Sequence, residues 1–209
     1  MLGYLFSNPF AMLIWLIALV IAVTVHEFAH AATAEYLGDP TPRLRGRLTL
    51  NPLAHLDPLG TIALLLVRFG WGKPVPFDPF NLTNPKRDGA IISVAGPASN
   101  ILLAVVLAVI VHLFPTSILS IILVPTIELN IILAIFNLIP IHPLDGGKIL
   151  IGLLPNDLAF RWDEILNQYG LILLLILIFP LGNNSLVGYL ISPIINVILN
   201  ILLPGAAFI

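Results

Sequence analysis

The segment HEFAH, residues 26–30, combines the residue types from which a hydrolytic metal site is built. His26 and His30 are four residues apart, so on a helix both imidazoles lie on one face and can reach one metal ion. Glu27 directly follows the first histidine, where its carboxylate can take a proton from water activated by the metal. Because the chain has no cysteine, a transition metal here must be bound by His, Asp or Glu.

A third ligand must come from elsewhere in the chain. We expect zinc, because two imidazoles and one carboxylate leave a position open for water, as catalytic zinc sites require. The expected ligand is a further buried acid, and there are four candidates: Glu35, Asp57, Glu128 and Asp145. The alternative is a polar cluster that only joins helices. It is disfavoured, because burying three such groups in one helical turn is costly without a ligand.

The composition indicates the surroundings of this site. Of the 209 residues, 58% are hydrophobic and only 10% are charged, whereas an ordinary soluble domain has about 25% charged residues. This composition is typical of an integral membrane protein built from helices, with the lipid bilayer as its partner. It excludes a nucleic-acid-binding protein, and the net charge of −2 gives no reason to expect a polyanionic partner.

Five apolar stretches are near or above the roughly 17–20 residues that cross a bilayer as a helix. They are residues 10–37, 89–113, 117–139, 165–181 and 185–203. A further run, residues 59–69, reaches only ~16 Å as a helix, so we expect it to be re-entrant. The chain is expected to be one domain over residues 1–209, with a core at about 10–150 and C-terminal helices at 165–203.

The basic residues predict the orientation. If residues 59–69 do not cross, all nine Lys and Arg residues lie on one side of the membrane, and positive residues favour the cytoplasmic side. We therefore predict a multi-pass protein of the cell membrane with its N-terminus outside. His30 then lies about 10 Å along the helix from the cytoplasmic end. Asp145 precedes Lys148 near the same face, so depth favours Asp145 as the third ligand and places the site near the cytoplasm.

Two cytoplasmic segments are predicted to be extended. Residues 43–50, RLRGRLTL, alternate polar residues with leucine or glycine, which is typical of a strand. Residues 73–77, KPVPF, contain two prolines, which suit an edge strand or a polyproline segment. The predicted fold class is an all-α polytopic membrane protein with about five transmembrane helices, a short re-entrant segment and small membrane-associated β elements.

HEFAH in the first helix, followed by NLIPIHPLDGG at 137–147, resembles the site-2 protease family of intramembrane zinc metalloproteases. NPLAHLDPLG at 51–60, GWGKPVPF at 70–77 and AGPASN at 95–100 resemble the compact prokaryotic branch, which lacks an inserted PDZ domain. The resemblance covers residues 23 to about 150 in consistent order. The combination is far more specific than HEFAH alone, a pattern that soluble zinc proteases also carry.

The resemblance implies a role for each matching residue. His26, His30 and Asp145 would bind one zinc ion per chain, and Glu27 would be the general base. Asn137 would hold the substrate backbone or the oxyanion. The segments around 43–50 and 70–77 would be the membrane-associated strands and loop that hold a substrate in extended form. The substrate-binding residues would be Gly70, Trp71, Gly72, Lys73, Pro74, Val75 and Pro76.

Other polar residues near these motifs are candidates for supporting roles. His55 and His142 could approach the site and assist the oxyanion, although for His55 a loop-structuring role is equally compatible with the sequence and for His142 an interfacial position is favoured. Gly96, Pro97 and Asn100 are expected to shape helix packing next to the site rather than to take part in chemistry, since small residues allow helices to approach closely.

The expected activity is cleavage of transmembrane or membrane-proximal segments of membrane proteins. A helical peptide bond is shielded, so the protease must unwind it, and an unpaired strand edge can replace the lost helical hydrogen bonds. Substrates whose transmembrane helix is already destabilised are therefore the expected partners.

Two other classes of protein compete with this interpretation. A metal transporter would need polar residues up to the outer face, but the outer halves of the spans are almost wholly Ile, Leu and Val apart from Glu128. A pseudoprotease would have lost Glu27 or a ligand, and none is missing.

Overall fold

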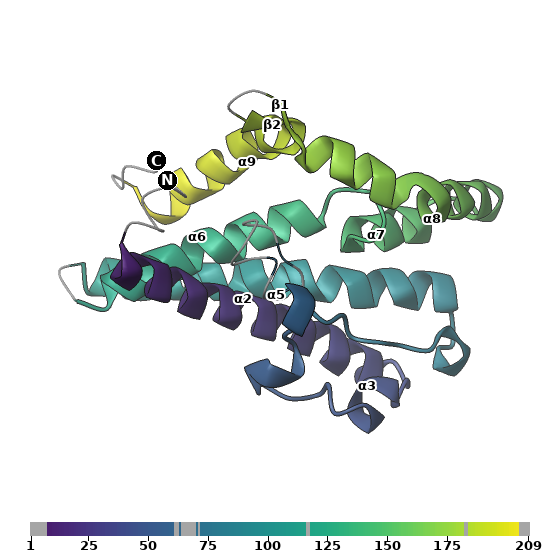
Figure 1. The fold of residues 1–209 in the computed structure, drawn as a ribbon. Coiled ribbons are helices and arrows are strands. Elements are labelled where there is room, and N and C mark those ends of the chain that lie inside the picture. The colour runs from purple at the N-terminus through teal and green to yellow at the C-terminus, as the bar shows by residue number, and fades with distance from the viewer. Residues whose placement is uncertain are drawn as a thin grey trace.

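The computed structural model describes residues 8–60, 63, 70, 72–115, 118–181 and 184–204, and these residues are mostly helical (Figure 1). The long helices are α2 (Pro9–Tyr36), α5 (Pro85–Leu113), α6 (Ser120–Asn137), α8 (Asn156–Ile178) and α9 (Leu186–Leu202). The short elements are α3 (Thr41–Leu44), α7 (Asp145–Leu153) and the 3₁₀ turns η1 (Pro52–Ala54) and η2 (Pro79–Asn81). Strands β1 (Pro180–Leu181) and β2 (Asn184–Ser185) form a two-stranded antiparallel pair.

The prediction of an all-α membrane protein is confirmed. Within the described ranges, α2, α5 and α6 are long and apolar enough to cross a bilayer. The fourth and fifth predicted spans correspond to α8, which starts well before residue 165, and to α9, which has 17 residues. The total of five crossings stays a prediction. The re-entrant segment expected at 59–69 falls largely outside the described residues, as does Trp71.

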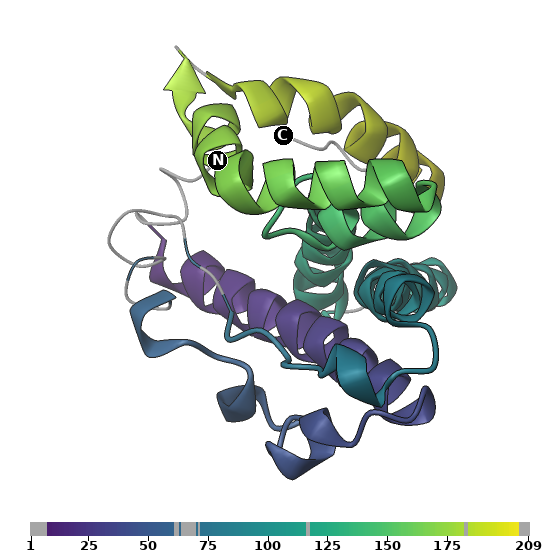
Figure 2. The same ribbon diagram turned by 90° about the vertical axis from the view of Figure 1, so that its right-hand side faces the viewer.

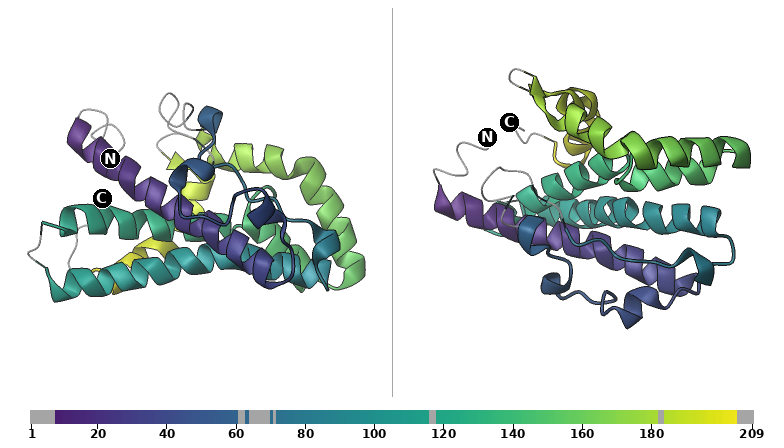
Figure 3. Two further views of the ribbon diagram at one scale, coloured as in Figure 1. Left: turned by 90° about the horizontal axis from the view of Figure 1, so that it is seen from below. Right: turned by 45° about the vertical axis from the view of Figure 1, so that its right-hand side comes forward.

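Helix α5 lies at the centre of the fold and packs against α2, α6 and α7. Figure 2 shows α8 and α9 as a layer on one side of α6, whereas α3 and η1 lie on the opposite side of α2. The views in Figure 3 agree with this arrangement. Two distant parts of the sequence, the C-terminal half of α2 and the start of α7, are thereby brought to the same central helix.

Small side chains allow this close packing. Helix α2 buries four alanines in full: Ala18, Ala22, Ala31 and Ala34. Without a hydrophobic driving force between helices in lipid, such small residues let backbones approach and increase van der Waals contact. Larger side chains fill the far end, where Ile127 and Ile131 of α6 meet Ile195 and Leu199 of α9.

The strand predicted at residues 43–50 is wrong. Pro42 occupies the first turn of α3, a position that a missing N–H favours. Gly46, with φ of +67°, then ends the helix, and the N–H groups of Gly46 and Arg47 donate to the carbonyls of Arg43 and Pro42. These two bonds form a Schellman cap. Local capping by glycine thus outweighs the alternation of side chains.

Residues 73–77 form neither a helix nor part of a sheet, and their extended conformation stays a prediction. Their connection to the rest of the fold is an antiparallel bridge between Leu56 and Gly72, with the Lys73 N–H donating to the His55 carbonyl at 2.8 Å. The buried Arg47 guanidinium donates to the carbonyls of Ala54 and Lys73 and holds the two loops together. The predicted membrane-associated β elements are therefore not formed by the described part of this region.

The Asp39 carboxylate, which follows α2, holds the connection against the helix end. It is fully buried and accepts hydrogen bonds from the Thr41 N–H and hydroxyl, the Asn81 side chain and the Asp78 N–H. Burial raises the pKa of the Asp39 carboxyl, but these donors together outweigh it and lower the pKa below its ordinary value. The carboxylate thus fixes the loop that leads to residues 73–77.

Replacing Asp39 with Asn should lower the free energy of unfolding by about 1.5–3 kcal/mol, because the amide presents only one acceptor oxygen to several donors. The measurement is denaturation in detergent micelles at pH 7. Asp157→Asn, at an exposed position in the first turn of α8, is the matched control and should change little. Equal stability of the Asp39 variant and the wild type would contradict this assignment.

The same substitution predicts a pH dependence. Because the folded-state pKa of Asp39 is lowered, its stabilisation is complete above the unfolded pKa of about 3.9 and is lost as the pH falls through the folded value. The stability difference between wild type and Asp39→Asn should therefore be constant from about pH 7 to 5 and shrink below pH 4. A difference that grew towards acid pH would have the wrong sign.

Candidate active site

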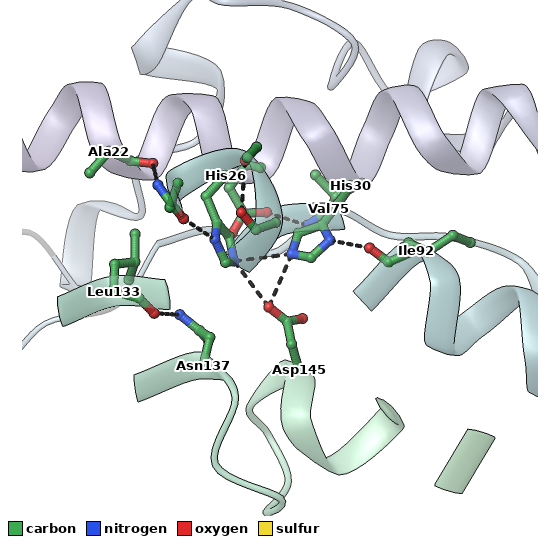
Figure 4. Close-up of polar contacts among 12 residues, drawn as sticks. Ala22, His26, His30, Val75, Ile92, Leu133, Asn137 and Asp145 are labelled. Atoms are coloured by element: carbon green, nitrogen blue, oxygen red, sulfur yellow. Dashed lines mark hydrogen bonds and ion pairs between the residues drawn. The ribbon is translucent and has the colours of Figure 1, made fainter. Parts of the chain in front are cut away.

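Three ligand-type atoms from two helices meet at the centre of the fold (Figure 4). The Nε2 atoms of His26 and His30 lie 3.0 Å apart. The Asp145 Oδ2 atom lies 3.0 Å from the first of them and 3.2 Å from the second. Both histidines are buried, and the two rings stand edge to face at 89°. The expected meeting of His26, His30 and Asp145 is what the structure shows.

The contacts of the two Nδ1 atoms, which face away from Asp145, show where a proton of each imidazole lies. His30 Nδ1 lies 2.7 Å from the Ile92 carbonyl oxygen, and His26 Nδ1 lies 2.6 Å from Asn100 Oδ1. Both partners accept hydrogen bonds, so each Nδ1 carries a proton, and in the neutral imidazole Nε2 then carries the lone pair. With both imidazoles neutral, three acceptor atoms face one another, and a cation between them would remove their mutual repulsion.

The donor set fits zinc. In a tetrahedral site with bonds of about 2.0–2.1 Å, neighbouring ligand atoms are about 3.3 Å apart, close to the 3.0–3.2 Å seen here. Two neutral imidazoles and a carboxylate leave a fourth position open. Hydrogen bonds from the outer nitrogens, as seen for both histidines, are the usual support of such ligands.

Two glycines place Asp145 at the start of α7. After α6 ends at Asn137, the chain turns sharply and α7 begins at Asp145. A Cβ at Gly146 would lie 2.2 Å from the Ile139 carbonyl oxygen, and one at Gly147 would lie 2.6 Å from His142 Nδ1. Only residues without a side chain let the first turn of α7 fold back onto this loop.

Glycine also lets α5 approach the two histidines. A Cβ on Gly96 would lie 2.4 Å from His30 Nε2 and 2.7 Å from His26 Cε1. Ile92, Gly96 and Asn100 are spaced four residues apart and therefore share one face of α5. This face places the Ile92 carbonyl against His30 and the Asn100 amide against His26, and Gly96 leaves room for both rings. The expectation that Gly96 and Asn100 serve only helix packing was too narrow, because Asn100 contacts His26 directly.

Glu27 lies beside the three-ligand site at the edge of a cavity of about 320 Å³. Its Oε2 accepts a hydrogen bond of 3.0 Å from the Val75 N–H, so the 73–77 segment reaches the carboxylate. The cavity is mainly lined by apolar residues of α2 and α6, and Gly70 and Gly72 also line it. The Glu27 carboxylate, the three-ligand site and the mainly apolar cavity are therefore next to one another.

Asn137 lines the same cavity from the end of α6. Its Nδ2 donates to the Leu133 carbonyl at 3.0 Å, within its own helix. The structure therefore places Asn137 at the cavity that Glu27 and His26 also line, with one of its two amide hydrogens occupied by a local bond.

The other acids considered as third ligands have different surroundings. Glu35 pairs with Arg43 at 2.8 Å, and Asp57 accepts from the Gly60 N–H at 2.7 Å. Glu128 lies in the middle of α6. Among the described residues, the cluster that could hold a metal ion consists of His26, His30 and Asp145 and does not include Glu128. The depth argument from the sequence therefore favoured Asp145, which is the acid that the structure brings to the histidines.

The two further histidines hold loops. The buried His55 ring lies with Nε2 2.8 Å from the Thr49 carbonyl, which fits the loop-structuring interpretation. His142 Nε2 lies 3.2 Å from Asp163 Oδ1 and joins the α6–α7 turn to α8. The Lys148 ammonium lies 4.4 Å from the Phe77 ring centroid and connects α7 to the end of the 73–77 segment. None of the sequence motifs indicated this contact.

Comparison with known proteins identifies the family. Residues 115–177 match Peptidase family M50. "Putative zinc metalloprotease YwhC" of Bacillus subtilis is 38% identical over 191 residues, covering 86% of this chain and 84% of that protein. "Putative zinc metalloprotease Rip2" of Mycolicibacterium smegmatis is 41% identical over 99 residues, which cover 44% of this chain and 36% of that protein.

A more distant relative extends the similarity. "Zinc metalloprotease MJ0392" of Methanocaldococcus jannaschii is 27% identical over 189 residues, which cover 89% of this chain and 48% of that protein. No solved structure matches the chain. The chain belongs to peptidase family M50, the site-2 protease family of membrane metalloproteases. Zinc is accordingly its cofactor.

Gly96→Ala should abolish or strongly weaken zinc binding, because the added Cβ would displace both imidazoles. We expect the zinc dissociation constant to rise by about tenfold or more, as for other changes that disturb ligand orientation. Gly89→Ala is the matched control in the same helix, since its Cβ would meet only Phe77 at 3.8 Å. The measurement is bound zinc per chain after dialysis against a chelator. Wild-type zinc content in the Gly96 variant would show that α5 does not press on the ligands.

Proposed function

We propose that this protein is an intramembrane zinc metalloendopeptidase of the HExxH type. Its substrates are transmembrane or membrane-proximal segments of other membrane proteins. The observation that carries the proposal is the site itself: three ligand-type atoms lie 3.0–3.2 Å apart, beside the Glu27 carboxylate and a cavity between membrane helices. His26, His30 and Asp145 are the proposed ligands.

The proposed mechanism follows from the residues around the cavity. When bound, zinc supplies Lewis-acid chemistry, which polarises the scissile carbonyl and lowers the pKa of water. Glu27 accepts a proton from the attacking water and passes it to the leaving nitrogen. The Val75 N–H holds Oε2 of this carboxylate, which orients the base. Asn137 Nδ2 has a second N–H besides the one bonded to the Leu133 carbonyl, and this N–H can donate to the oxyanion.

Substrate binding is proposed along residues 70–76. Gly70 and Gly72 border the cavity, and the Val75 N–H contacts Glu27. Residues 73–77 have no neighbouring strand among the described residues. Pro74 and Pro76 have no N–H, and the N–H groups of Lys73 and Val75 are already bonded, so the proposed pairing with an unwound substrate uses mainly carbonyl groups of this segment. A substrate whose helix contains breakers gives up less helical hydrogen bonding on entry, so it is the preferred partner.

The orientation of the protein is part of the proposal. In Figure 1, α3 and α7 lie towards the same end of the bundle, where Arg43 and Lys148 are located. Positive residues favour the cytoplasm. We therefore place this end, and the nearby metal site, at the inner face of the cell membrane, with the N-terminus outside.

Glu27→Gln should retain zinc and lose cleavage. The amide keeps the size of the side chain but has no basic oxygen to accept the proton, so the rate should fall by about 10²–10⁴-fold. The assay is cleavage in proteoliposomes of a transmembrane peptide with a central Gly-Pro pair, with zinc content measured in parallel. Cleavage at the wild-type rate would refute the mechanism.

Two ligand variants separate binding from chemistry. His26→Ala and Asp145→Ala should lose zinc and cleavage together, because each removes one corner of the three-atom site. Glu35→Ala is the matched control, since that carboxylate pairs with Arg43 instead, and it should retain both. Zinc retained by both ligand variants would refute the ligand assignment.

The absence of native cysteine allows a direct test of orientation. Pro115→Cys lies beyond the end of α5, and Arg45→Cys lies at the end of α3, both at exposed positions. A membrane-impermeant maleimide added to intact cells should label the first and not the second, and permeabilisation should expose the second. The reverse pattern would invert the proposed topology.

A further inference from the structure

A chain of buried side-chain amides runs from α6 through α5 to the metal site. Asn130 Nδ2 donates to the Thr126 carbonyl at 2.7 Å. Asn100 Nδ2 donates to Asn130 Oδ1 at 2.7 Å and to the Ala22 carbonyl at 3.0 Å. Asn100 Oδ1 faces His26 Nδ1 at 2.6 Å. Both asparagines are fully buried, at 0% exposure, so their hydrogen bonds are made within the protein.

Backbone carbonyls determine the direction of every hydrogen bond in this series of amides. Backbone carbonyl oxygens can only accept, so the Thr126 carbonyl turns the Asn130 amide nitrogen towards itself and leaves Oδ1 facing Asn100. The Ala22 carbonyl and Asn130 Oδ1 then both require the nitrogen of Asn100. The oxygen of Asn100 is left to face His26, where it can only accept the Nδ1 proton.

We infer that Asn100 and Asn130 are positioning residues that fix the tautomer of His26 and thereby make its Nε2 a zinc ligand. If Nε2 carried the proton instead, it would point at His30 Nε2 and Asp145 Oδ2 and exclude a cation. In a membrane interior no bulk water replaces a lost partner, so the amides are needed to keep this tautomer.

The two histidines differ in how they can be perturbed. His30 is oriented by the backbone carbonyl of Ile92, which no side-chain substitution removes. His26 depends on a side chain of α5, which in turn depends on a side chain of α6. Zinc binding by residues of α2 and α7 is thus coupled to the packing of α5 against α6. The inference rests on the zinc site of the proposed function.

The test compares two substitutions of similar volume. Asn100→Leu removes the acceptor for His26 Nδ1, whereas Asn100→Asp keeps an oxygen there and loses the donor to Ala22 and Asn130. The zinc dissociation constant, measured by chelator competition in detergent, should rise about 10–100-fold for Leu and stay within a few-fold of wild type for Asp. The visible spectrum of the Co²⁺-substituted protein should change for Leu and be preserved for Asp.

Thermal unfolding separates this role from a structural one. Both Asn100 variants should lose stability, because both leave buried carbonyl and amide groups unpaired, whereas only Leu should lose zinc affinity. Equal loss of zinc by the two variants, or none by Leu, would overturn the inference.

Two substitutions on α6 extend the test. Asn130→Leu should weaken zinc binding even though the residue touches no ligand, and it decides the question if Asn100→Leu does not fold. Thr126→Val is the matched control: it is buried on the same helix, it retains the backbone carbonyl that anchors Asn130, and it should bind zinc as wild type. Zinc affinity unchanged in Asn130→Leu would overturn the part assigned to α6.

These readouts need no substrate. A wild-type chain that binds zinc but cleaves nothing would refute the proposed proteolysis, while the affinities and spectra of the variants would still decide the positioning role.

Discussion

The close approach of three ligand-type atoms from two helices is the constraint on which the rest of this structure depends. Two imidazole nitrogens and a carboxylate oxygen are held within 3.0–3.2 Å of one another in an apolar interior. Such a group is tolerated because a cation compensates it and because the surrounding helices prevent the rings from turning away. The alanines of α2, Gly96 of α5 and the two glycines after Asp145 all serve the close approach that this requires.

A membrane environment makes hydrogen-bond direction unusually decisive. In water, a histidine that loses one partner finds another, but in the interior of a helix bundle each donor needs a specific acceptor. Here the specificity originates in backbone carbonyls, which have only one possible role. Helical geometry determines where these carbonyls lie, so the secondary structure itself sets the protonation pattern of the ligand histidines.

The loop between α2 and α5 combines rigidity with access. Asp39, Arg47 and the bridge from Leu56 to Gly72 hold it against the bundle, so residues 73–77 are delivered to Glu27. This segment is held by side chains and a single bridge rather than by a sheet. A helical bundle thus presents a segment that is neither helix nor sheet next to its apolar cavity.

The sequence by itself determined the class of fold, the approximate limits of the apolar helices and the pairing of His26 with His30, because helical periodicity and apolar length are local properties. It also favoured Asp145, since depth in a membrane can be counted in residues. It failed at residues 43–50, where a proline and a left-handed glycine outweighed alternation. Only the tertiary structure decided that Asn100 contacts His26 and that Val75 contacts Glu27, because these contacts join segments 74 and 48 residues apart. Their geometry depends on how closely the helices and the loop pack, which no local pattern encodes.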